Sequence, residues 1–261
     1  MVDDIRKLVK GKSVLLVGNS VEMMKYRCAK FIDGFDIVVR FGRAIEANPM
    51  QQERVGKKCD IWITGQFRAP CYNNLRKEFE SGRYKDTYIL VNRSRGNLAI
   101  DNWKIEEHLP EGMPQNFMYS DAEIVNIMKK FGKNMMDPKE DRPSAGFISL
   151  LWFMDRVKTY KTISLIGFDF FSKQTNIVPK GKNGEISACQ PHSWHLPVYV
   201  LDRSAHDSDM EKNYVKRCVE KKLLHWYILS DLKKEKIKYD GWMRGMKIIH
   251  SLPYKTKKSK I

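Results

Sequence analysis

The stretch SVLLVGNS at residues 13–20 sets the class of fold that the sequence predicts. Its first five residues form a short apolar run that ends at Gly18, and the next stretch, residues 21–32, has the mixed periodicity of a helix. A buried strand, a tight turn and a helix in this order form one βα unit of a parallel sheet. The sequence thus predicts that the chain opens with such a unit.

The rest of the chain repeats this alternation of apolar runs and helical stretches. Further strands are predicted at residues 35–41, 60–64, 87–91 and 162–167. Helices are predicted at residues 122–132, 147–158 and 209–229, the last of them running toward a final strand. This pattern predicts an α/β fold, a single Rossmann-like domain over residues 1–261 with a mostly parallel sheet flanked by helices. Residues 171–205 lack periodicity and are predicted to be a lid or acceptor loop, and about residues 252–261 form a basic tail.

The composition indicates a basic protein of a reducing compartment. Its 47 Lys+Arg and 31 Asp+Glu give a net charge of +16, which attracts a nucleotide, a nucleic acid, an acidic glycan or an anionic membrane. The five cysteines form no C-x-x-C pair, and their odd number argues against a disulfide framework. With no signal-peptide pattern and no long apolar run, we expect a cytoplasmic protein. Peripheral contact at the inner face of a membrane stays open, because lysines of the tail lie near Trp242 and Tyr254.

Two turns have the pattern of a phosphate cradle, in which small and hydroxyl-bearing residues lead into a helix N-terminus. The residues are Gly18, Asn19 and Ser20 in the first turn, and Arg142, Ser144 and Gly146 in the second. Arg142 is a candidate counter-charge for a bound phosphate. Both turns also have the composition of ordinary helix caps, so that alternative stays open.

Three other candidates are polar side chains near the predicted site. His206 begins an H-x-x-x-x-E pattern that ends at Glu211, and a histidine can act as a general base at neutral pH. The alternative is a surface histidine on an acidic turn. Asp169 directly follows a predicted core strand, where it faces the site or acts as a cap. His192 and His195 lack the partners of a zinc site, and we expect neither a metal nor a cofactor.

In this order, the motifs VGNS, DIVVRFGRA, PSAGF, IGFDF and HDSDME resemble those of the sialyltransferases. The first two are similar to the long amino-terminal motif of the animal-type enzymes, in which a D-x-V-x-R-x-N-x-A segment follows a VGNS-like turn. PSAGFISLLW is similar to their short motif, and His206 with Glu211 matches their H-x-x-x-x-E. Bacterial sialyltransferases have a comparable layout, with an arginine that Arg142 matches. The resemblance covers roughly residues 17–211.

The resemblance implies a GT-A-like variant of the Rossmann fold that transfers a sugar from a CMP-linked donor with inversion and without a metal. By position, His206 would deprotonate the acceptor hydroxyl, and Glu211 would support it. The residues implied in nucleotide or donor binding are Gly18, Asn19, Ser20, Arg40, Arg43, Arg142, Ser144, Gly146 and Asp169. The implied partners are a CMP-sugar donor and a glycan or glycolipid acceptor, such as lipopolysaccharide.

Two positions depart from the family pattern near the donor. Gly42 stands where the animal-type motif has asparagine, and Phe171 stands where bacterial enzymes place a tyrosine. Both changes bear on which sugar the donor carries more than on which nucleotide carries it. Kdo, another ulosonic acid, is therefore an alternative to sialic acid. Two other function classes stay open: a basic nucleic-acid-binding α/β protein, for which no specific module is visible, and another Rossmann-like transferase such as a methyltransferase.

Overall fold

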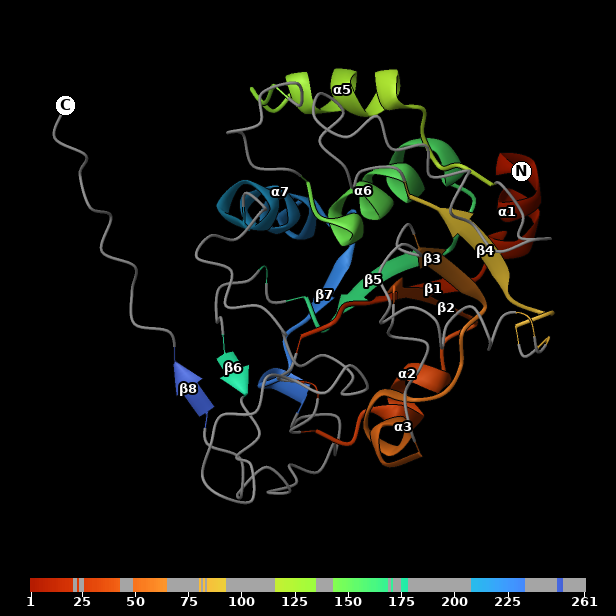
Figure 1. Cartoon of the computed structure of the whole chain (residues 1–261), viewed down its shortest axis with the longest axis vertical. Helices are drawn as coiled ribbons and strands as arrows, with labels where there is room; N and C mark the ends of the chain where they lie inside the picture. Colours follow the sequence, from red (N-terminus) through yellow and green to blue (C-terminus); the bar gives the residue numbers. More distant parts are fainter. Residues whose placement is uncertain are drawn as a thin grey trace, which may run out of the picture.

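Six parallel strands form the centre of the molecule in the computed structural model (Figure 1). The strands are β1 (Ser13–Val17), β2 (Ile37–Phe41), β3 (Ile61–Thr64), β4 (Tyr88–Val91), β5 (Thr162–Ile166) and β7 (His225–Tyr227). They are ordered β4-β3-β2-β1-β5-β7, and every neighbouring pair is parallel. The structure describes residues 1–20, 23, 26–42, 49–64, 80, 82, 84–92, 116–134, 143–168, 170, 175–177, 208–232 and 248–250.

Helices cover both faces of this sheet (Figure 1). One face carries α1 (Val2–Val9), α5 (Asp121–Lys129), α6 (Ala145–Trp152), its π-helical continuation η5 (Phe153–Val157) and α7 (Ser208–Glu220). The other face carries α2 (Ala29–Asp33) and α3 (Pro49–Val55). Because side chains alternate along a strand, Val14 and Leu16 of β1 enter the first layer of the core and Leu15 and Val17 the second. The predicted α/β fold with a parallel sheet is confirmed.

Two predicted helices are shorter than expected. Among the described residues of the range 21–32, an α-helix is present only as α2, and the chain before it makes tight turns with bonds from Met23 N to Ser20 O and from Tyr26 N to Met23 O. The helix expected over residues 209–229 ends at Glu220. Lys222 there has φ 57°, and Leu223 N donates to Cys218 O, which closes the helix and turns the chain into β7.

One strand of a second, two-stranded sheet lies in the predicted lid or acceptor loop. β6 (Thr175–Ile177) pairs antiparallel with β8 (Ile248–His250). β6 thus falls within residues 171–205, whose role as a lid or acceptor loop stays a prediction. The rest of that predicted lid, apart from β6, and the predicted tail at residues 252–261 lie outside the described residues.

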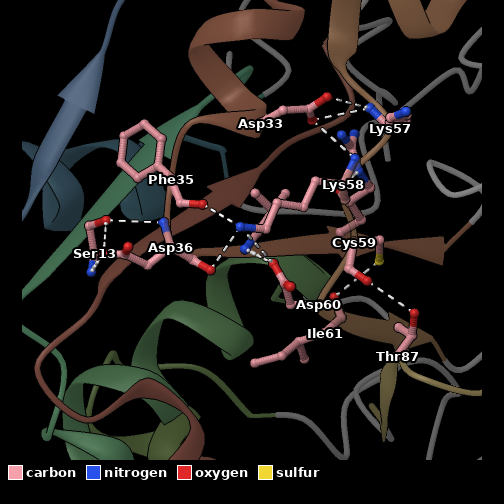
Figure 2. Close-up of polar contacts among 12 residues, drawn as sticks. Ser13, Asp33, Phe35, Asp36, Lys57, Lys58, Cys59, Asp60, Ile61 and Thr87 are labelled. Carbon is pink, nitrogen blue, oxygen red and sulfur yellow. Dashed lines mark hydrogen bonds and ion pairs between the residues drawn. The ribbon is translucent and has the colours of Figure 1, made fainter.

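Where the strands begin, which we call the amino edge of the sheet, polar side chains tie neighbouring strands together (Figure 2). Asp36 accepts hydrogen bonds from the backbone N–H of Ser13 at 2.8 Å and from its hydroxyl at 2.6 Å. Asp60 accepts from Val38 N at 2.7 Å, and Thr87 donates to Cys59 O at 3.0 Å. Each of these bonds joins one strand start to the next, so this edge satisfies its own polar groups.

Candidate functional site

The candidate site lies at the opposite edge, where strands β1 and β5 end. The chain leaves β1 toward β2 on one side, while β5 lies on its other side, so the order of strands reverses between β1 and β5. In open α/β sheets this reversal opens a crevice in which ligands bind. We call this side of the sheet the carboxyl edge.

Two glycines bring the ends of β1 and β5 into backbone contact. A Cβ atom on Gly18 would collide with the carbonyl oxygen of Gly167, and Gly167 itself has φ 70°. Gly18 N donates to Ile166 O at 2.7 Å, and Ser20 N donates to Gly167 O at 3.0 Å. The first predicted cradle therefore uses two of its backbone N–H groups within the protein. Asn19 at its tip is exposed and donates from Nδ2 to Phe41 O at 3.4 Å.

Phe168 connects this contact to the second predicted cradle. Its ring lies so close that a Cβ atom on Gly18 would be 2.8 Å from Phe168 Cδ2, and one on Gly146 would be 2.5 Å from Phe168 Cε1. The ring also packs edge-on against Phe41 at the end of β2, with the ring centroids 5.9 Å apart. The missing side chains of both glycines thus make room for one aromatic ring, and the motifs VGNS, PSAGF and IGFDF meet there.

Ser144 and Glu211 join the start of α6 to the first turn of α7. Ser144 is the N-cap of α6, and its hydroxyl accepts from Phe147 N at 3.1 Å. The carboxylate of Glu211, only 1% exposed, accepts from Ser144 N at 2.6 Å and from the Ser144 hydroxyl at 2.7 Å. A buried carboxylate is stabilised by such bonds and by the positive end of the α6 dipole. The motifs PSAGF and HDSDME are therefore in direct contact.

Among the described residues, the capping of α6 leaves two donors at its first turn. Four backbone N–H groups at a helix start lack partners within the helix. Here Ser144 N binds Glu211, and Phe147 N binds the Ser144 hydroxyl. The N–H groups of Ala145 and Gly146 lie between these two, next to the crevice. A phosphate that binds this helix start would accept from them.

Asn92 is a polar residue of this edge that the sequence analysis missed. It follows β4 directly, is buried, and donates from Nδ2 to Ala145 O at 3.4 Å. The same carbonyl accepts from the Ser149 hydroxyl at 2.6 Å. The sequence does carry a signal for Asn92. It is a polar residue that follows an apolar run, as Asn19 and Ser20 do after β1.

Arg40 has its guanidinium in the core rather than at the crevice. The side chain, 2% exposed, points to the α2–α3 face and donates from Nε to Lys58 O at 2.8 Å and from Nη2 to Val55 O at 2.7 Å. Among the described residues, its Nη1 has no hydrogen-bond partner. These contacts give Arg40 a structural role that the sequence did not indicate, and its contact with a donor stays a prediction.

The structure describes only some of the remaining predicted residues. Arg43, Arg142, Asp169 and His206 lie outside the described residues, as do Phe171, His192 and His195. Gly42 has φ 51°, a conformation that glycine and asparagine adopt most readily, so glycine at this position preserves the backbone and omits a side chain. Within the described ranges, no group of three or more His, Cys, Asp or Glu side chains could hold a metal ion.

Several solved structures that are similar to this chain in fold are sialyltransferases. The α-2,3-sialyltransferase Cst-I from Campylobacter jejuni matches with a TM-score of 0.50 at 14% identity, over 83% of this chain and 75% of that chain. A mammalian sialyltransferase in complex with Gal-β-1-3GalNAc-ortho-nitrophenol has a TM-score of 0.46 at 14% identity, over 85% of this chain and 71% of that one. A single-residue variant of the sialyltransferase CST-II in complex with CMP has a TM-score of 0.48 at 13% identity, over 83% of this chain and 81% of that one. At these identities the similarity is one of fold.

No protein-family model and no curated protein sequence matches the chain. Of the helices that the structure describes, none has the length and the apolar character needed to cross a bilayer.

Proposed function

We propose that the chain is a glycosyltransferase that moves sialic acid or a related ulosonic acid such as Kdo from a CMP-linked donor to a glycan hydroxyl. The observation that carries this proposal is the pair of hydrogen bonds between Glu211 and Ser144. This contact holds the α7 start, which follows His206 in the chain, against the first turn of α6 at the sheet's switch point. A base for the acceptor and a cradle for the leaving phosphate would thereby share one crevice.

In the proposed reaction, His206 accepts the proton of the acceptor hydroxyl as its oxygen attacks the anomeric carbon from the face opposite the phosphate. The new C–O bond forms as the bond to the CMP phosphate breaks, and the configuration inverts. The N–H groups of Ala145 and Gly146 stabilise the negative charge on the departing phosphate. Glu211 is itself negative and occupies the cap, so the phosphate needs a further positive charge, for which Arg142 is the candidate.

Metal independence is also part of the proposal. CMP leaves with a single phosphate, for which helix N–H groups and one arginine provide the compensation. The chain does contain one Asp-x-Asp sequence, Asp207-Ser208-Asp209, so the acidic pair that binds a metal in other transferases is present as a pattern. Unchanged turnover after EDTA treatment is the expected result, and activity restored only by a divalent cation would overturn this part.

A donor screen tests the function itself. CMP release from CMP-sialic acid and from CMP-Kdo is measured beside UDP- and GDP-sugars for the native chain, His206→Ala and the control His225→Ala. His225 is an exposed histidine at the other edge of the sheet. We expect turnover of one CMP-sugar, loss of turnover with retained CMP binding in His206→Ala, and no change in His225→Ala. Turnover of a UDP-sugar without CMP-sugar turnover contradicts the proposal.

The same samples distinguish the two rival classes. Thermal stabilisation by S-adenosylmethionine and not by CMP would indicate a methyltransferase. Salt-sensitive binding of generic RNA or DNA without any CMP binding would indicate a nucleic-acid-binding protein.

A further inference from the structure

Three neighbouring loops at the amino edge carry six exposed lysines. The loops are residues 10–12 before β1, 158–161 before β5 and 221–224 before β7, and these strands are adjacent in the sheet. The lysines, which we call the basic face, are Lys10, Lys12, Lys158, Lys161, Lys221 and Lys222. Backbone bonds from Gly11 N to Thr159 O and from Lys161 N to Lys12 O hold the first two loops together.

The basic face has little internal compensation. The three loops contain no carboxylate, and the one ion pair of these lysines among the described residues joins Lys158 Nζ to exposed Asp155 at 3.9 Å. Asp36, at the adjacent start of β2, accepts from the backbone and hydroxyl of Ser13 and also interacts electrostatically with Lys12, and exposed Glu220 precedes Lys221, so these acids offset part of the positive charge of the six lysines. The lysines therefore lie on one side of the molecule with most of their charge available to an anionic partner.

Two of these lysines occupy backbone positions that favour glycine. Lys158 and Lys222 have φ 53° and 57°, and each closes a helix just before a strand begins. Helices α1, α3 and α5 end on glycines in the same left-handed conformation: Gly11, Gly56 and Gly132. At both positions a lysine adopts a left-handed backbone conformation that glycine, which has no side chain, adopts most readily. Glycine would therefore fit both positions with less backbone strain than lysine.

An apolar side chain at this face favours lipid over nucleic acid as the partner. Leu223 follows Lys222 in the turn and is 53% exposed. An exposed leucine beside lysines fits the headgroup boundary of a bilayer, where apolar side chains insert and lysines contact anionic headgroups. Nucleic-acid surfaces instead use arginines and stacked aromatics, which the three loops lack apart from the half-buried Tyr160.

We propose that the basic face docks the protein on an anionic lipid surface. The crevice at the carboxyl edge then points away from the lipid, separated from it by at least the length of a five-residue strand, about 17 Å. A docked protein therefore acts on groups that stand well clear of the bilayer surface. The inference does not depend on which reaction the crevice catalyses.

Vesicle binding by the full chain tests the proposal with a matched control. The vesicles are phosphatidylcholine alone, or an equimolar mixture with phosphatidylglycerol. Lys221→Gln/Lys222→Gln removes two adjacent lysines after α7, and the control Lys129→Gln/Lys130→Gln removes two at the end of α5. The control pair is exposed and lies near Phe131, whose ring packs on Phe147 at the start of α6, on the carboxyl-edge side.

We expect binding only to the anionic vesicles and its loss as the salt rises from about 0.1 M to about 1 M. The Lys221/Lys222 variant should bind about 20-fold more weakly, since each lysine near an anionic surface strengthens binding about fivefold. The control pair should bind as the native chain does. Equal losses in both variants, binding to neutral vesicles, or duplex DNA binding that is as tight and as sensitive to the Lys221/Lys222 pair would overturn the proposal.

A second variant separates docking from folding. Lys158→Gly/Lys222→Gly removes two charges and relieves two strained backbone positions, so its Tm should rise by about 2–4 °C while vesicle binding falls about 20-fold. A defect in folding cannot produce these opposite changes. Native vesicle affinity in this variant would contradict a role of the basic face.

Discussion

The two edges of the sheet use polar residues in opposite ways. At the amino edge, Asp36 and Asp60 each bind the backbone of a neighbouring strand directly, and the polar groups are satisfied within the fold. At the carboxyl edge, two glycines allow the ends of β1 and β5 to touch, a buried carboxylate binds the N-cap of α6, and these capping bonds do not use the N–H groups of Ala145 and Gly146. The carboxyl edge therefore offers donors to a ligand, whereas the amino edge offers only charges at the tips of long side chains.

The strongest effect should come from breaking the contact that defines the carboxyl edge. Glu211→Ala leaves Ser144 N without its acceptor in a buried place, which should lower the free energy of unfolding by about 2–4 kcal/mol. The α7 start then shifts, and a displacement of about 1 Å at the catalytic groups is expected to reduce kcat about 100-fold. Chemical denaturation and CMP release measure the two effects. The control Glu220→Ala removes an exposed glutamate of the same helix. If the folded Glu211→Ala variant keeps the native kcat, the contact between Glu211 and Ser144 is not needed for catalysis.

The next effect tests whether Arg40 belongs to the core or to the site. Arg40→Ala leaves the carbonyls of Val55 and Lys58 without their donor and opens a cavity, so we expect a loss of about 3 kcal/mol in the free energy of unfolding. The Kd for CMP, measured by calorimetry at a temperature where the variant is folded, should be unchanged. A Kd raised tenfold or more in the folded variant would show that Arg40 contributes to donor binding.

Arg40 shows why parts of the site could not be predicted from sequence. The strands were predicted well because all of their central residues are buried, which produces continuous apolar runs. A charged residue inside such a run looks like a ligand contact, since its real partners, the carbonyls of Val55 and Lys58, have no signature in the sequence. Glu211 and Ser144 were both selected, yet no periodicity relates residues 67 positions apart, so their contact emerged only from the structure. Asn92 was missed because it belongs to no quoted motif.

A smaller effect distinguishes two causes of crowding, contact with backbone atoms at Gly18 and contact with a side chain at Gly146. In Gly18→Ala the new methyl group meets the backbone of Gly167, which cannot move without disturbing β5, and a loss of about 2 kcal/mol is expected. In Gly146→Ala it meets the ring of Phe168, which can turn away, so the loss should be about 1 kcal/mol. Phe168→Leu should restore Gly146→Ala but not Gly18→Ala. Thermal unfolding of the native chain, the two glycine variants and their combinations with Phe168→Leu decides this, and equal rescue of both would show that the ring alone sets the crowding.

The weakest effect concerns the amino edge. The hydroxyl of Ser13, followed by its backbone N–H, holds the pKa of Asp36 below its ordinary value of 3.8. Because the folded pKa is lowered, ionised Asp36 stabilises the fold above pH 3.8, and this contribution disappears as the pH falls through the lowered pKa. Asp36→Asn should therefore have a slightly lower Tm than the native chain at pH 7, and this difference should shrink as the pH falls below 3.8. A gap in Tm that persists at low pH would mean that the carboxylate charge is not responsible.

The bond between Ser144 and Glu211 also affects the order in which the molecule forms. It joins residues 67 positions apart, and closing so long a segment is slow compared with forming α6 from residues that are neighbours in the chain. During synthesis, α6 leaves the ribosome with its cap incomplete and acquires the second half only after α7 has been made. A nascent chain that ends before residue 211 therefore contains the sequence of β1 to β5 but lacks the carboxylate that completes the α6 cap.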